Sequence, residues 1–169
     1  SSDLMPADKG LVALKKLPFI RAVTLSAEQI TRDAGAYHAA GYEVGAFIYS
    51  LEDARAAIAA RLEYVIIGDE PNMYKVSAAQ YLETARPISD YLRANAFTGI
   101  ISAAGLAEEY SGFLGTPAPA ETYLRELVRL EQGEVFDALA CNPFQCGHDA
   151  WRKVFDKIAP GRLVLCPGW

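Results

Sequence analysis

Short runs of apolar, β-prone residues recur along the chain, and each is followed by a longer alanine-rich stretch with apolar residues on one helical face. Several runs are apolar throughout rather than alternating with polar residues, which is typical of parallel strands covered on both faces. We predict six strands from these runs, at residues 19–25, 44–49, 64–68, 98–102, 136–140 and 162–166.

The stretches between the runs carry helix signals. Ser26 and Ser50 are suited to N-cap positions, and Gly41 and Gly133 stand where a helix would end. Pro87 is expected to kink or split the longest helix. The predicted helices cover residues 26–40, 51–61, 77–96, 120–132 and 149–158. Strands that alternate with helices imply a parallel sheet with right-handed crossovers.

The strand spacing suits either a (β/α)8 barrel or a doubly wound sheet. A Rossmann-type sheet normally carries a glycine-rich turn after its first strand, and the segment 24–28 contains no glycine. We therefore predict an α/β fold of the TIM-barrel type. The barrel is expected to be incomplete, because only six βα units are legible in 169 residues and a full barrel takes about 250. A single domain spans 1–169, with 1–17 as a lead-in segment.

Composition narrows the classes of protein and partner. The chain has 16 Lys+Arg against 21 Asp+Glu, a net charge of −5, and 51% hydrophobic residues, which favours a folded domain over disorder. Without a basic block, nucleic acid is not an expected partner. No apolar run is long enough for a membrane span, and no signal peptide is visible.

Three cysteines, at 141, 146 and 166, give no disulfide framework. Cys141-x4-Cys146-x-His148 misses the usual spacing of zinc ligands, so we expect small buried thiols and neither a metal nor a cofactor.

The strongest chemical signal is the segment 64–72, Tyr-Val-Ile-Ile-Gly-Asp-Glu-Pro-Asn. A buried strand ends on Asp69 and Glu70, at the carboxyl end where barrel enzymes hold their catalytic residues. An acid held against apolar walls there has a raised pKa and can act as a general acid. The alternative is that one of the two carboxylates caps the following helix.

The residues around this motif resemble the clan of (β/α)8 glycoside hydrolases with catalytic carboxylates on strands four and seven. In that clan strand four ends in Asn-Glu-Pro, and the segment 68–72 matches at Glu70 and Pro71. Residues 136–144 and 163–169 are similar to its sixth and seventh strands, so the six strands would be strands two to seven. The resemblance implies hydrolysis of O-glycosidic bonds in a polysaccharide or glycoconjugate, with Glu70 as general acid/base.

Departures from the clan's pattern leave two interpretations open. Where the clan has its Asn, this chain has Asp69; where the clan has its His, this chain has Asn142; and the position of the clan's nucleophilic Glu is occupied by Cys166. In one interpretation Asp69 and Glu70 work as a pair, as in substrate-assisted N-acetylhexosaminidases, which need no second Glu. In the other, the chain has kept the fold and lost the chemistry, which leaves a non-catalytic carbohydrate-binding or structural domain.

The same resemblance suggests residues that contact a carbohydrate. Tyr49, Asn142 and Trp169 lie at the ends of predicted strands and would shape a sugar site by stacking and hydrogen bonding. Asn72 belongs to the motif itself.

Arg21 has two interpretations. It either pairs with Asp69 or Glu70 inside the barrel, as an early Arg of this clan does, or it occupies a partly exposed edge position.

An open sheet of six parallel strands leaves edges that must be covered, so other chains or chain segments are expected to complete the barrel.

Overall fold

The chain forms a main sheet of parallel strands that alternate with helices, as seen in a computed structural model that describes residues 7–107, 109–111, 114–116, 118–142 and 147–167. The strands of this sheet are β1 (Ala22–Leu25), β2 (Glu43–Ile48), β3 (Tyr64–Ile67), β4 (Ile100–Ala107), β7 (Ala138–Asn142) and β8 (Leu163–Leu165). A separate antiparallel pair consists of β5 (Glu109–Ser111) and β6 (Leu114–Thr116).

Within the described residues there are six α-helices and one 3₁₀ helix, of which α1 precedes the first strand and the others connect strands. They are α1 (Ala7–Leu14), η1 (Ala27–Gln29), α2 (Ile30–Ala39), α3 (Leu51–Ala59), α4 (Ala78–Ala94), α5 (Ala118–Glu131) and α6 (Gly147–Ile158). No helix among these residues is long and apolar enough to cross a membrane.

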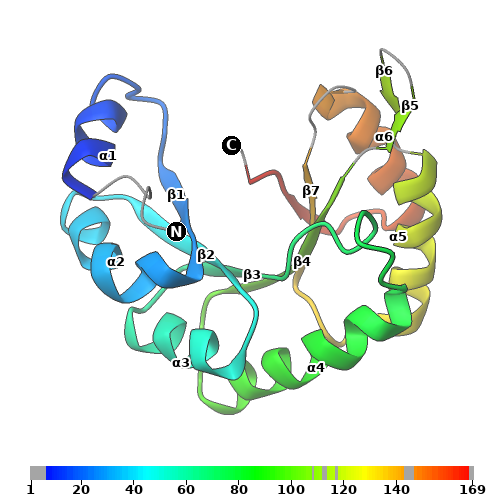
Figure 1. Ribbon diagram of the computed structural model, residues 1–169, viewed down its shortest axis with the longest axis horizontal. Coiled ribbons are helices and arrows are strands. Elements are labelled where there is room, and N and C mark those ends of the chain that lie inside the picture. The colour runs from blue at the N-terminus through cyan, green and yellow to red at the C-terminus, as the bar shows by residue number, and fades with distance from the viewer. Residues whose placement is uncertain (1–6, 108, 112–113, 117, 143–146, 168–169) are drawn as a thin grey trace.

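The main sheet has the order β1-β2-β3-β4-β7-β8, and every neighbouring pair is parallel. Figure 1 shows the sheet curled into an arc, with α2, α3, α4 and α5 along its outer side. Within the described residues β1 and β8 are edge strands, so the barrel is not closed. The predicted fold, an incomplete TIM-type barrel, is confirmed.

The two faces of the sheet explain why the strands are apolar throughout. On β3, Val65 and Ile67 belong to the core that the helices cover, while Ile66 lines a hollow of about 900 Å³. All three side chains are buried. The strand therefore reads as a continuous apolar run, as expected for a sheet with two covered faces.

Three local features differ from the sequence-based expectation. The lead-in segment contains α1, whose Leu11 and Leu14 pack against the core. The β5–β6 hairpin follows β4, in residues where the sequence pattern predicts no strand. Helix α4 continues through Pro87 without splitting, because buried residues on both sides of the proline, such as Tyr81 and Leu92, hold it against the sheet.

Candidate functional site at the carboxyl ends of the strands

The turn that follows β3 has an unusual backbone. Gly68 has φ of +82°, which glycine tolerates, but Glu70 has φ of +42°, where a side chain is strained. The Glu70 N–H donates to Gly105 O of β4 at 3.0 Å. The turn is therefore pulled over the neighbouring strand, and Asp69 and Glu70 are held at the carboxyl end of the sheet.

Asn142, the last residue of β7, links the two carboxylates. Its Nδ2 donates to Glu70 Oε1 at 2.9 Å and to Asp69 Oδ1 at 3.3 Å, and the residue is only 1% exposed. Its Oδ1 is buried without a hydrogen-bond partner among the described residues. Leaving an amide oxygen buried without a partner is costly. The two hydrogen bonds that Nδ2 donates to the carboxylates must therefore be what holds the Asn142 side chain in this orientation.

Gly105 makes room for this amide. A Cβ at position 105 would lie 2.5 Å from Asn142 Oδ1 and 2.9 Å from Asn142 Cγ. The register between β4 and β7 shifts between Ser102 and Gly105, a bulge of the kind found beside functional sites. The glycine and the bulge together let Asn142 reach across to the end of β3.

Asn72 fixes the far side of the same turn. Its Nδ2 donates to Ala107 O at 2.8 Å, and its Oδ1 accepts from Ala107 N at 3.1 Å. Through these two bonds to the backbone, Asn72 joins the turn to the end of β4.

The charge at the site is not neutralised. No Lys, Arg or His forms an ion pair with Asp69 or Glu70 within the part of the chain that the structure describes. Burial raises the pKa of Asp69, the neighbouring charge of Glu70 raises it further, and the hydrogen bond from Asn142 opposes both. Asp69 therefore keeps its proton to a higher pH than an ordinary aspartate.

Asp69 also borders a cavity of about 200 Å³ between the end of β3 and α4. Three tyrosines line it: Tyr49, Tyr74 and Tyr81. Burial raises the pKa of Tyr49, and the charge of Asp69 contributes to the same shift. Tyr81 donates to Ile67 O at 2.6 Å and accepts from Ala104 N at 2.8 Å, which ties the wall of the cavity to β3 and β4.

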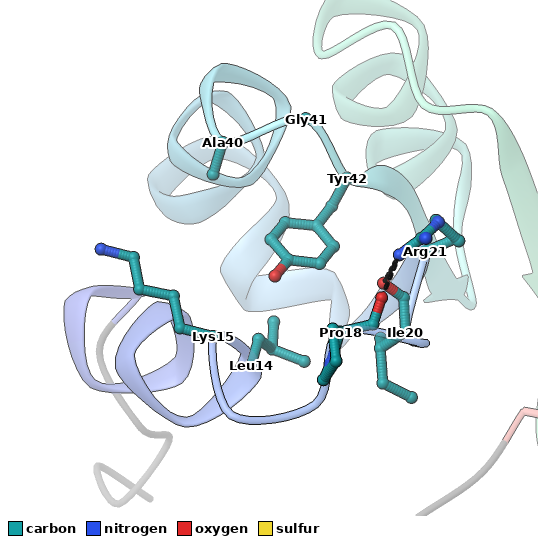
Figure 2. A pocket seen from close by; sticks show the side chains of 8 residues that line it. All are labelled: Leu14, Lys15, Pro18, Ile20, Arg21, Ala40, Gly41 and Tyr42. Carbon is teal, nitrogen blue, oxygen red and sulfur yellow. Dashed lines mark hydrogen bonds between the residues drawn. The ribbon is translucent and has the colours of Figure 1, made fainter.

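Arg21 lies at the opposite edge of the sheet, just before β1. Figure 2 shows it at the rim of a pocket of about 330 Å³, with the Tyr42 ring beside it and Lys15 extending away. Its guanidinium donates to the carbonyl oxygens of Pro18 and Ile20. Within the described residues it forms no ion pair with either carboxylate of the site, so the expected pairing inside the barrel is not present.

The structure thus brings together Asp69, Glu70 and Asn142, with Tyr49 at the adjoining cavity and Asn72 behind the turn. Trp169 lies outside the described residues. Sequence reasoning missed Gly105 and Tyr81. For Gly105 the available signal was a glycine inside a strand-like run, which indicates a bulge or a close approach.

No protein-family model matches the chain, and no curated protein matches it. Solved structures do match. The HMG-CoA lyase from Brucella melitensis is 14% identical with a TM-score of 0.58, over 97% of this chain and 65% of the lyase. A thiamine phosphate pyrophosphorylase from Pyrococcus furiosus is 16% identical with a TM-score of 0.47, and the match covers 93% of this chain and 81% of the pyrophosphorylase chain.

The match to the lyase corrects the predicted family. The lyase is a TIM-barrel protein and not a glycoside hydrolase. The resemblance to the glycoside hydrolase clan is therefore wrong, and so is the prediction of a glycosidase. The alternative, a non-catalytic carbohydrate-binding or structural domain, is not specifically supported by the match. The physical reason is that carboxylates at the carboxyl end of a barrel strand are a general property of barrel enzymes, so a Glu-Pro match identifies no single clan.

At 14% identity the likeness to the lyase shows the fold alone, and this chain spans 65% of the lyase's length.

Proposed function

We propose that this half-barrel carries an acid–base site in which Asp69 transfers a proton to and from a small bound molecule. The observation that carries the proposal is the buried Asn142 amide, which bridges two adjacent carboxylates at the carboxyl end of the strands. Holding two like charges together under one neutral donor raises the pKa of Asp69 above that of an ordinary aspartate, so that it exchanges its proton at a higher pH.

Asp69 is favoured over Glu70 as the proton-transferring group. Asp69 lines the 200 Å³ cavity, which Glu70 does not border, and it has the raised pKa. Glu70 contributes the charge that opposes ionisation of Asp69, and Asn142 holds the pair in place.

The lining of the cavity indicates what kind of molecule it accepts. Its walls are mostly apolar and aromatic, and the only carboxylate among its lining residues is Asp69. An anionic ligand would be repelled by the pair. The expected substrate is a small, largely uncharged molecule that presents an acidic C–H or a hydroxyl group to Asp69.

A base in an apolar pocket can be tested without knowing the natural substrate. In 5-nitrobenzisoxazole, removal of the C3 proton by a base breaks the N–O bond and releases a coloured cyanophenolate. We expect the protein to accelerate this ring opening beyond an equal concentration of acetate. The rate should rise with pH through a midpoint above the ordinary aspartate value.

Asp69→Asn should reduce the rate by about 100-fold or to the buffer rate, since general-base catalysis contributes about 10²–10⁴. The matched control is Glu52→Gln, which removes an exposed carboxylate from the first turn of α3 on the same edge of the sheet. Equal rates for wild type and Asp69→Asn, or no acceleration over acetate, would overturn the proposal.

A further inference from the structure

Two thiols lie together at the carboxyl ends of β7 and β8. Cys141 Sγ and Cys166 Sγ are 3.4 Å apart. Cys141 is buried, and Cys166 is exposed. One sulfur is therefore open to a reagent in solution while the other stands directly behind it.

The sheet register accounts for this proximity. In the parallel pair of β7 and β8, Ala140 is opposite Leu165, so the next residues along are Cys141 and Cys166. Neighbouring strands are about 4.8 Å apart, which lies within the Cα separation that disulfides span. The sulfurs need only to approach from 3.4 Å to about 2.05 Å to bond.

Cys166 also has the surroundings of a reactive thiolate. The hydrogen bond from Cys141 lowers the pKa of Cys166 to about 6; burial opposes this shift, and a hydrogen bond and the charge of His148 reinforce it. His148 stands in the first turn of α6. Cys166 further lines the 900 Å³ hollow on the inner side of the sheet, which gives a small oxidant access.

We propose that Cys166 and Cys141 form a peroxide-oxidisable dithiol, with Cys166 as the attacking and Cys141 as the resolving thiol. The Cys166 sulfur attacks one oxygen of a hydroperoxide; the O–O bond breaks, and the leaving oxygen takes up a proton as alcohol or water. The Cys141 sulfur then attacks the Cys166 sulfenic acid; an S–S bond forms, the S–O bond breaks, and water leaves with the Cys141 proton.

Overall two thiols and one hydroperoxide give a disulfide, an alcohol (water, from hydrogen peroxide) and water. The two electrons come from the dithiol. The disulfide would lock β7 to β8 at the carboxyl edge of the sheet. This proposal does not depend on the role of Asp69.

The test treats the folded chain with hydrogen peroxide and maps disulfides by mass spectrometry of unreduced peptides. We expect a linked peptide that contains Cys141 and Cys166. It should disappear in Cys166→Ser and Cys141→Ala and persist in Cys146→Ser. In Cys141→Ala, dimedone should trap the sulfenic acid at Cys166. A link through Cys146, or no link between residues 141 and 166, would overturn the proposal.

Alkylation kinetics give a second readout. At pH 6, about half of a thiol with a pKa near 6 is thiolate, against about 0.3% of an ordinary thiol; after allowing for lower intrinsic nucleophilicity, the net advantage is about tenfold. Cys166 should therefore react with iodoacetamide about tenfold faster at pH 6 than a cysteine in a short peptide. A rate equal to the peptide's would contradict its role as the attacking thiol.

Discussion

At the amino ends of the strands Glu63 accepts a hydrogen bond from Val44 N at 2.6 Å and one from His38 Nε2 at 2.9 Å, whereas Asp69 at the carboxyl ends accepts one from Asn142 Nδ2 at 3.3 Å and lies beside the charge of Glu70. Glu63 directly precedes the short strand β3, and Asp69 follows the same strand. Hydrogen bonds outweigh burial and lower the pKa of Glu63, while burial and Glu70 raise that of Asp69.

The same treatment of carboxylates recurs along the amino edge. Asp137 accepts from Ile101 N and from Arg93 Nη2, both at 2.9 Å, and Glu131 pairs with Arg162 Nη1 at 2.8 Å. Each of these carboxylates thus forms an ion pair with an arginine from another segment of the chain. The carboxylates of the amino edge are therefore paired, whereas within the described residues Asp69 and Glu70 at the carboxyl edge form no ion pair. Barrel proteins generally place stability at the amino edge and function at the carboxyl edge in this way.

The largest expected effect comes from breaking the most buried pair of the amino edge. The side chain of Glu131 is fully buried, and Arg162 also donates to Phe136 O at 2.7 Å. Glu131→Ala leaves the guanidinium without its counter-charge and should lower the free energy of unfolding by about 3 kcal/mol, measured by urea denaturation. Its control is Glu126→Ala, which breaks only the exposed pair with Arg129. Equal losses in the two variants would contradict the assignment.

A smaller loss of stability, with an effect on the site, is expected from Gly105→Ala. The new Cβ would collide with Asn142, so either the strand or the amide must move. This should lower the free energy of unfolding by about 1–3 kcal/mol. Displacing the amide removes the hydrogen bond that holds down the pKa of Asp69, and this pKa should rise further. Urea denaturation and carboxyl-carbon NMR titration measure the two effects.

Gly35→Ala is the matched control for this substitution. Gly35 lies within α2 with no neighbouring atom within 4 Å of an added Cβ, so alanine there should leave stability unchanged or raise it. If Gly105→Ala behaves like Gly35→Ala, the packing of Asn142 onto Gly105 does not shape the site.

The amino-acid pattern is sufficient to predict the sheet and part of the site. A continuous apolar run followed directly by Asp69 and Glu70 predicts a buried strand with carboxylates at its carboxyl end, and Asn142 follows from the same argument on β7. Of the two interpretations of Arg21, the exposed edge position holds and the pairing with the carboxylates does not, and the reason is the boundary of a run. The apolar stretch begins at residue 19 but β1 begins at Ala22, so Arg21 precedes the strand and lies at the amino edge.

The features that tune the site depend on contacts between strands distant in sequence. The bulge at Gly105, the positive φ of Glu70 and the approach of Cys141 to Cys166 arise from how β4, β7 and β8 align with their neighbours. A local pattern can mark a glycine such as Gly105 as the site of a bulge, but it does not give the register between two strands. Family assignment failed for a related reason, since two matching residues at a strand end describe the edge of any barrel.

The smallest effect tests the contrast between the two ends of β3 directly. For Glu63 the folded pKa is lowered from its ordinary value of 4.5, so its stabilising contribution is present above that value and is lost as the pH falls below it. For Asp69 the folded pKa is raised from 3.8, so a penalty develops as the pH rises from 3.8 through the folded value and persists above it.

At pH 7, therefore, Glu63→Gln should lower the urea midpoint and Asp69→Asn should raise it. At about pH 3, near or below the ordinary carboxyl values, both differences from wild type should shrink. Urea titrations of the three proteins at the two pH values measure the signs. If both variants shift the midpoint in the same direction at pH 7, the two ends of β3 do not treat their carboxylates differently. Opposite signs would show that the charged carboxylate of Asp69 itself destabilises the fold. A carboxylate that is held for proton transfer in unfavourable surroundings is one whose neutral replacement stabilises the protein.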